Sequence, residues 1–152
     1  MSASTTTSEV RPRATIGDGA IRTALALFGL VYVGLAVWMA AAPHTFYRAL
    51  GPFDIYNAHY LRDVASFEGA IGIGLLIAIR RPSWRVPMLA VSALQYSLHS
   101  INHLVDIDIA HPKWIGYFDF FTLLATAVQL VVLYVAVQRR HPEPPTTEGG
   151  AR

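Results

Sequence analysis

Long apolar runs separated by short polar segments dominate the pattern of the chain. Four runs approach or exceed the length of about 20 residues that a helix needs to cross a bilayer, and they cover residues 21–42, 61–79, 86–105 and 115–137. Backbone groups find no water in hydrocarbon, so such runs must be helical. The runs lack the strict apolar–polar alternation of a membrane barrel. The pattern predicts an all-α protein, an integral membrane four-helix bundle with up-down-up-down topology.

The segments outside the runs predict two tails and one structured connection. Residues 1–19 are rich in Ser and Thr and residues 139–152 in Pro and Gly, so we expect disordered cytoplasmic tails around a transmembrane domain at residues 20–138. The first run exceeds the roughly 7–15 apolar residues of a signal peptide. We therefore expect a retained helix, with cleavage near residues 39–42 as the alternative. In the first connection, 44–50 predicts a short interfacial helix that ends at Gly51, with Phe46 and Leu50 facing lipid.

Composition agrees with the apolar pattern and excludes several classes of protein. Of the 152 residues, 14% are charged and 53% are hydrophobic, whereas a soluble domain carries about 25% charged residues. The absence of cysteine excludes disulfides, iron–sulfur clusters, Cys-ligated zinc and a thiol nucleophile. The twelve Lys and Arg residues form no basic stripe, so nucleic acid is not expected as a partner.

The cations also predict the orientation of the spans. Cytoplasmic segments of membrane proteins carry an excess of Lys and Arg. One side of the predicted bundle carries Arg11, Arg13, Arg22, Arg80, Arg81, Arg85, Arg139, Arg140 and Arg152, and the other carries Arg48, Arg62 and Lys113. We therefore expect a multi-pass protein of the cell membrane, surrounded by lipid, with both termini in the cytoplasm.

Ionisable residues from three predicted helices fall at a similar depth below the outer surface. At 1.5 Å per residue, Glu68, His99 and Asp119 lie about 6–10 Å inside their spans. Two polar stripes continue from them, and lipid offers polar side chains no partner, so both should face the bundle interior. The stripes comprise Gln95, His99, Asn102, His103 and Asp106 on one helix, and Asp119, Thr122, Thr126 and Gln129 on the other.

The second span divides its ionisable residues between two faces. Glu68 is expected to point inward. Asp63 lies about 140° away from it around the helix and shares a face with His59. We expect Asp63 to form an ion pair at the interface with His59 or with Arg62.

The polar cluster predicts a metal-binding or redox-associated accessory subunit. His99 and His103, at i and i+4, reach one point beside their helix, and Glu68, Asp106 and Asp119 would complete the ligands. Gln95, Asn102 and Thr122 would orient these ligands by hydrogen bonds. Histidine with carboxylate suits zinc, iron or copper. Haem is less favoured, because the second span has no histidine within the hydrocarbon. The substrate, and whether the chain is an enzyme, stay open.

The alternative is a non-catalytic assembly partner, whose cluster is an interhelical hydrogen-bond network. Its second span is rich in small residues, which let helices approach closely, namely Ala65, Gly69, Ala70, Gly72 and Gly74. The partner would be a larger membrane complex or a second copy of the chain. A channel is disfavoured, because the inner halves of the spans carry few polar residues besides Ser92 and Gln129.

Part of the second span resembles a known family. The segment Phe67-Glu68-Gly69-Ala70-Ile71-Gly72-Ile73-Gly74-Leu75-Leu76 is similar to the acidic, then glycine-rich helix of DoxX-like small bacterial membrane proteins, which share the size and the four-span topology. Members are linked to thiosulfate:quinone oxidoreduction and to oxidative-stress complexes. The resemblance implies a redox-associated accessory role and carries over Glu68 and its glycines.

Overall fold

The fold is all α-helical in the computed structural model, which describes residues 16–140. Its elements are α1 (Asp18–Ala41), α2 (Pro43–Leu50), α3 (Ala58–Arg80), the short 3₁₀ helix η1 (Pro82–Trp84), α4 (Arg85–Val105) and α5 (Lys113–Gln138), with no strand in this part of the chain. The predicted helix class is therefore confirmed. The predicted tails fall mostly outside the described residues, but α1 begins at Asp18, inside the segment expected to be a tail.

Two of the four long helices meet the length and composition expected of a membrane span. Within the described residues, α1 and α5 are long and apolar enough to cross a membrane. Helices α3 and α4 have 23 and 21 residues, so they are long enough as well. Their polar residues make them less apolar than the other two. By length and composition alone, the first and last of the four predicted spans therefore qualify as candidate membrane-spanning helices.

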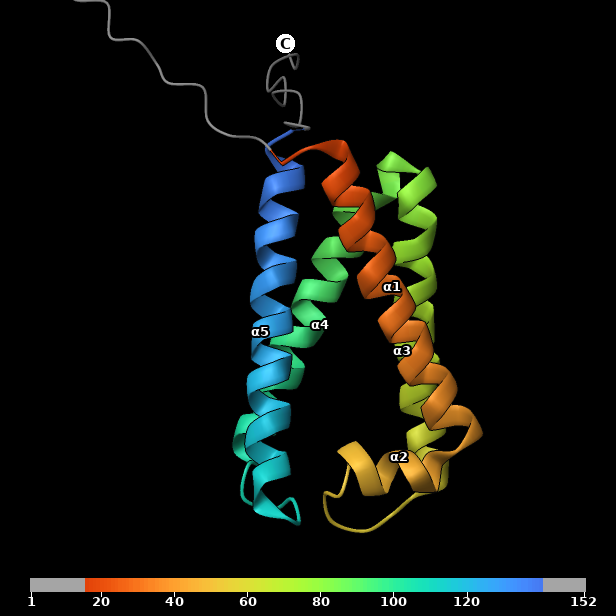
Figure 1. Ribbon diagram of the computed structural model, residues 1–152, viewed down its shortest axis with the longest axis vertical. Helices are drawn as coiled ribbons and strands as arrows, with labels where there is room; N and C mark the ends of the chain where they lie inside the picture. The colour runs from red at the N-terminus through yellow and green to blue at the C-terminus, as the bar shows by residue number, and fades with distance from the viewer. Residues whose placement is uncertain (1–15, 141–152) are drawn as a thin grey trace, which may run out of the picture.

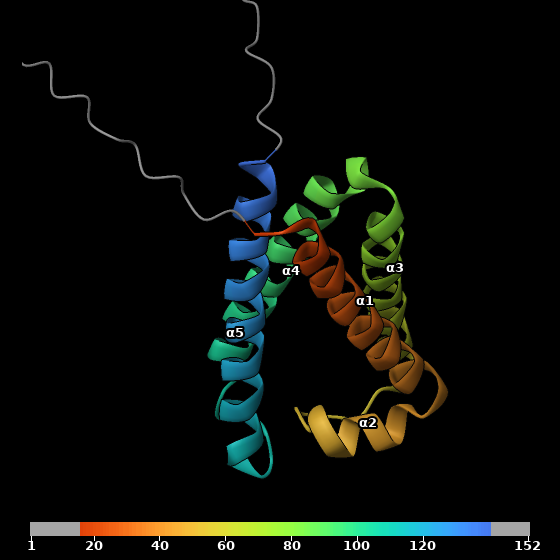
Figure 2. The ribbon, with the colours of Figure 1, turned by 45° about the horizontal axis from the view of Figure 1, so that its top comes forward.

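The long helices form two antiparallel pairs rather than one evenly packed bundle. Helix α1 packs along α3, and α4 packs along α5. The pairs approach each other at the end that carries η1 and diverge toward the other end, where α2 lies across the gap (Figures 1 and 2). We call these the η1 end and the α2 end. Neighbouring long helices run in opposite directions, as the predicted topology requires.

Glycines allow the close packing of α1 on α3. A Cβ atom on Gly72 would lie 2.9 Å from the carbonyl oxygen of Gly29, and one on Gly29 would lie 3.0 Å from the carbonyl oxygen of Gly72. Gly74 packs in the same way against the side chain of Met88 on α4. The small residues that the sequence singles out in the second span therefore serve packing inside this chain.

Apolar side chains fill the interior toward the η1 end. All four long helices contribute to one buried cluster, whose members include Leu25, Tyr32, Leu75, Leu89, Tyr96, Leu130 and Val137. The buried hydroxyl of Ser92 is satisfied within its own helix, by the carbonyl of Met88 at 2.7 Å. This half of the molecule is a largely apolar core.

Arg85 joins three elements at the η1 end. Its side chain is only 5% exposed. The guanidinium donates to the carboxylate of Asp18 on α1 at 2.5 Å and to the backbone carbonyl of Ala78 on α3 at 3.2 Å. The last carbonyls of a helix have no partner inside the helix, so Arg85 caps α3 while it holds the start of α1 beside α4.

Helix α2 turns its apolar side into the protein, which corrects the expectation that it faces lipid. Phe46 and Leu50 both line the interior cavity between the helix pairs, and the Phe46 ring meets Trp38 edge-on at 5.4 Å. The helix does end before Gly51, as predicted. The apolar residues of α2 share one side of the helix, as the sequence predicts. That side packs inward because it borders the cavity between the diverging helix pairs.

The connection after α2 reaches across to the second helix pair. The hydroxyl of Tyr47 donates to the backbone carbonyl of Asp54 at 2.6 Å, which holds the loop against α2. The backbone amide of His111 donates to the carbonyl of Pro52 at 3.3 Å. Because His111 precedes α5, these bonds close the α2 end over the gap.

Gly116 permits the tight connection between α4 and α5, and its replacement by alanine should destabilise the protein. A Cβ atom there would collide with the backbone carbonyl of Ile107. We expect Gly116→Ala to lower the free energy of unfolding by about 1–3 kcal/mol. Circular dichroism during thermal unfolding in detergent micelles would measure the loss. Gly19→Ala is the control, because a Cβ atom on Gly19 meets nothing within 4 Å. Equal melting temperatures for the two variants would contradict the prediction.

Candidate functional site

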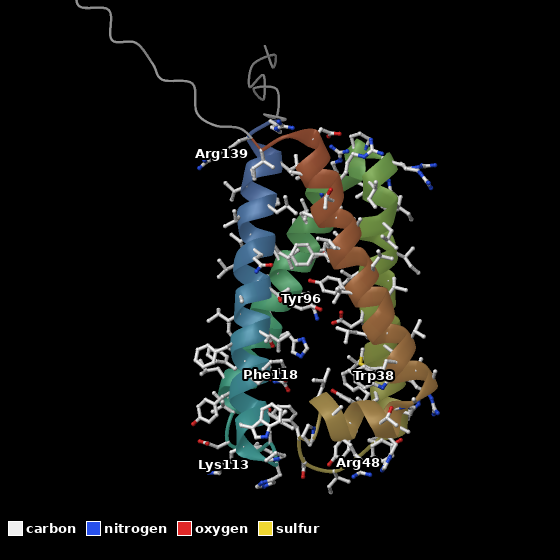
Figure 3. The ribbon with its side chains drawn as sticks, in the orientation of Figure 1. Trp38, Arg48, Tyr96, Lys113, Phe118 and Arg139 are labelled. Atoms are coloured by element: carbon white, nitrogen blue, oxygen red, sulfur yellow. The ribbon has the colours of Figure 1, made fainter. Side chains whose placement is uncertain are left out.

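A cavity of about 400 Å³ lies between the helix pairs toward the α2 end. Its walls come from all four long helices, from α2 and from the following loop, and most of its lining is apolar. Figure 3 shows Tyr96 between the two pairs, with Phe118 on α5 and Trp38 on α1 nearer the α2 end. The polar residues of the lining include Glu68, Tyr96, His99, Asn102, His103, Asp106, Asp119 and Thr122.

Glu68 points inward from α3, as the sequence predicts, and is 4% exposed. Both of its carboxyl oxygens accept hydrogen bonds from α4. The hydroxyl of Tyr96 donates to Oε2 at 3.1 Å, and the side-chain amide of Gln95 donates to Oε1 at 3.2 Å. Tyr96 in turn stacks on Tyr32 of α1, with ring centroids 4.7 Å apart. The carboxyl group of Glu68 is therefore held in a fixed position by neutral donors.

His99 and His103 contact each other on α4 beside the cavity. Their Nε2 atoms lie 3.1 Å apart, a hydrogen-bond distance. When both rings are neutral, one Nε2 must donate and the other must accept. The two Nδ1 atoms are then one donor and one acceptor, and both are buried without a hydrogen-bond partner among the described residues. The pair therefore offers a ligand one hydrogen-bond donor and one hydrogen-bond acceptor.

Asp119 of α5 is 8% exposed and lines the cavity. Its Oδ2 atom is buried and has no hydrogen-bond partner among the described residues. The neighbouring hydroxyl of Thr122 cannot serve it, because that hydroxyl donates to the backbone carbonyls of Phe118 and Asp119. The carboxyl group of Asp119 is consequently available to a ligand in the cavity.

The structure brings most of the predicted cluster to one cavity without assembling a complete metal centre. Asn102 and Asp106 also border the cavity, and Gln95 reaches Glu68. Yet across residues 16–140 no group of three or more His, Asp or Glu side chains is close enough to hold a metal ion. Among the five predicted ligands, His99 and His103 are the two whose side chains are seen in contact.

Three of the remaining predicted positions lie at the exposed surface of α3, and one on α5 is not where the sequence predicts it. His59 lies 3.5 Å from Asp63 on the exposed face of α3, while Arg62 donates to the backbone carbonyl of Ala40 at 3.4 Å. Gln129 is exposed, so the predicted inward stripe on α5 is wrong at this position. The two helix pairs do not enclose α5 on that side.

The sequence did not reveal the roles of two further residues, Tyr96 beside the cavity and Arg85 at the η1 end. Tyr96 donates to Glu68, and the signal that could have found it is its position three residues before His99, which places both side chains on one side of the helix. Arg85 was counted only as a cytoplasmic cation. No local pattern reveals its role, because its partners Asp18 and Ala78 lie in other helices.

Comparisons with protein-family models, curated proteins and solved structures find no match to this chain. Buried polar atoms are nearly always hydrogen-bonded. Here Asp119, both histidines and Gln95 each have a buried polar atom without a partner. A mostly apolar cavity with a few convergent polar groups is the usual form of a small-molecule site.

Proposed function

We propose that this chain is a multi-pass membrane protein in which α1, α3, α4 and α5 all cross the bilayer. The support for α3 and α4 comes from their outward faces. Phe67 and Ile73 on α3 are more than half exposed, and so are Leu94, Leu98, Ile101 and Val105 on α4. A monomeric soluble protein rarely exposes such continuous apolar surface. Several of the polar residues that lower the hydropathy of these two helices line the cavity, among them Glu68, His99, Asn102 and His103.

The distribution of cations supports cytoplasmic placement of the η1 end. Among the described residues, this end carries Arg22, Arg80, Arg81, Arg85, Arg139 and Arg140, whereas the α2 end carries Arg48, Arg62 and Lys113. Figure 3 shows Arg139 at one extreme of the molecule and Arg48 and Lys113 at the other. By the excess of positive charge on cytoplasmic segments, the cavity opens in the outer half of the membrane.

The function that the geometry supports best is binding of a small, largely apolar molecule in this cavity. The observation that carries the proposal is the combination of an apolar wall with buried, unpaired polar atoms at Asp119, His99 and His103. The apolar wall would hold the body of the ligand, and the polar atoms would fix its orientation.

Filling the cavity is the direct test of this proposal. The probe is a diazirine-labelled 1-dodecanol, photo-activated with the purified protein in detergent, and the labelled peptides are identified by mass spectrometry. Leu123→Trp would fill the cavity, because Leu123 lines it. Leu124→Trp is the matched control, because the neighbouring side chain is exposed and lies outside that lining. We expect labelling of cavity residues in the wild type and in Leu124→Trp, and its loss in Leu123→Trp. Labelling confined to the outward faces would refute the proposal.

A second candidate is the metal-binding or redox-associated accessory role, favoured by the distance between the two histidines. Two nitrogens bonded to one zinc ion at about 2.0–2.1 Å lie about 3.3 Å apart in a tetrahedral site, and the Nε2 atoms are 3.1 Å apart. The fit is incomplete, since a third ligand from this chain would require movement of Asp119, Asp106 or Glu68. The resemblance of α3 to DoxX-like proteins also supports this candidate.

Metal analysis of the purified protein separates the two candidates. If the second is correct, the wild type should contain zinc, iron or copper at close to one ion per chain. His99→Ala should remove the ion, and His59→Ala should retain it, because His59 is on the exposed face of α3. A wild-type protein without stoichiometric metal after loading would rule out this candidate. The role of assembly partner has less support, because the glycines of α3 pack against α1 and α4.

A further inference from the structure

The charge of the cavity lining selects among the molecules that could bind there. Three carboxyl groups line it, those of Glu68, Asp106 and Asp119, and the lining includes no Lys or Arg. Glu68 and Asp119 are more than nine-tenths buried. Burying a carboxylate away from water without a counter-charge costs free energy. Inside a membrane this cost is high, because charged groups lose their hydration there.

The two buried acids differ in what they still require. Glu68 already accepts one hydrogen bond on each oxygen, from Tyr96 and Gln95. Asp119 has a buried oxygen with no partner, and no side-chain donor of the described residues reaches it. Among the described residues, the Oδ2 atom of Asp119 therefore has no hydrogen-bond donor, and the cavity lining around it has no Lys or Arg.

We propose that the ligand is a lipophilic amine, bound as its ammonium ion with an alkyl or aryl body. This inference rests on the proposed ligand-binding function. The ammonium group would donate a hydrogen bond to Asp119. The carboxyl group of Glu68, which also lines the cavity, would add electrostatic attraction. The aromatic rings of Phe118 and Tyr96 border the same space and favour a cation over their faces. The apolar body would lie against the cavity walls, whose volume of about 400 Å³ falls within the range of small-molecule sites.

The alternatives lack the same complementarity. An anionic head group, such as a carboxylate or phosphate, would meet three acids without a single lining cation. A neutral alcohol would donate one hydrogen bond to Asp119 but would bring no positive charge to a lining that carries three acids. The amine alone supplies both the donor and the charge.

The test compares head groups on a constant alkyl chain. Binding of dodecylamine, 1-dodecanol and dodecanoate to the wild-type protein in neutral detergent is measured by native mass spectrometry and by the shift in melting temperature. We expect dodecylamine to bind about tenfold or more tightly than 1-dodecanol, because a hydrogen bond to a charged group is stronger than a neutral one. Dodecanoate should bind most weakly.

A variant then locates the effect. Asp119→Asn should remove the preference for dodecylamine over 1-dodecanol, because the amide carries no negative charge. Asp63→Asn, which removes an acid on the exposed face of α3, should preserve the preference. The wild-type comparison needs no variant, so it decides even if Asp119→Asn fails to fold. Equal binding of amine and alcohol would overturn this inference and leave the proposed function intact. Absence of binding by all three would overturn the proposed function itself.

Discussion

Gly72→Leu is expected to prevent the stable folding of this protein. The backbones of α1 and α3 meet at Gly72, where a Cβ atom would lie 2.9 Å from both the carbonyl oxygen of Gly29 and the amide nitrogen of Val33. These obstacles are backbone atoms in the middle of a helix, so they cannot rotate away. A leucine would force the helices apart, at a cost of about 3 kcal/mol or more. Unfolding in detergent with increasing dodecyl sulfate, followed by circular dichroism, measures the effect.

The matched control places the same residue at Gly34 on α1. Gly34 is exposed on the outward face, and a Cβ atom there meets nothing within 4 Å. Gly34→Leu should leave stability unchanged or raise it by up to about 1 kcal/mol, because leucine favours helix more than glycine does. If the two variants were equally stable, α1 and α3 would not pack through Gly72.

The second large effect is expected from Arg85→Met, which keeps an apolar stem and removes the guanidinium. The variant leaves the carbonyls of Ala78 and Ile79 without their donor at the end of α3 and frees Asp18 of α1. We expect a loss of about 2–3 kcal/mol in the free energy of unfolding, the range for hydrogen bonds made by a charged group. Thermal unfolding in detergent micelles would measure it.

Two further variants assign that loss to the geometry of the guanidinium. Arg80→Met removes an exposed cation from the same end and should change stability little. Arg85→Lys should recover only part of the loss, because one ammonium group cannot reach partners on two helices as the planar fork does. Full recovery by lysine would show that charge alone matters at this position.

Helical periodicity predicted the placement of several cavity residues correctly. The inward placement of Glu68, the shared face of His99 and His103, and the burial of Asp119 all follow from rotation per residue and from the lack of polar partners in lipid. Each is a property of a single helix and its surroundings. The His59–Asp63 contact belongs to the same class, because its members are i and i+4 on one helix.

Periodicity failed where the answer depended on distances between helices. It placed Gln129 in the interior and Phe46 against lipid, whereas Gln129 is exposed and Phe46 lines the cavity. Both errors assumed four helices packed evenly around one axis. It also grouped five residues as metal ligands, three of them (Glu68, His99 and Asp119) because they share a depth, although depth does not fix the separation of side chains on helices that diverge.

The amino-acid sequence alone predicted the long helices, their ends to within a few residues, and the polar faces of α3 and α4. These properties depend on the local order of apolar and polar residues. Three features became apparent only in three dimensions: the two helix pairs, the cavity between them toward the α2 end and, among the described residues, the unpartnered Oδ2 atom of Asp119. Those features arise because Gly29 and Gly72 draw α1 onto α3 while Arg85 joins the pairs at the η1 end, and contacts between distant segments leave no local pattern in the sequence.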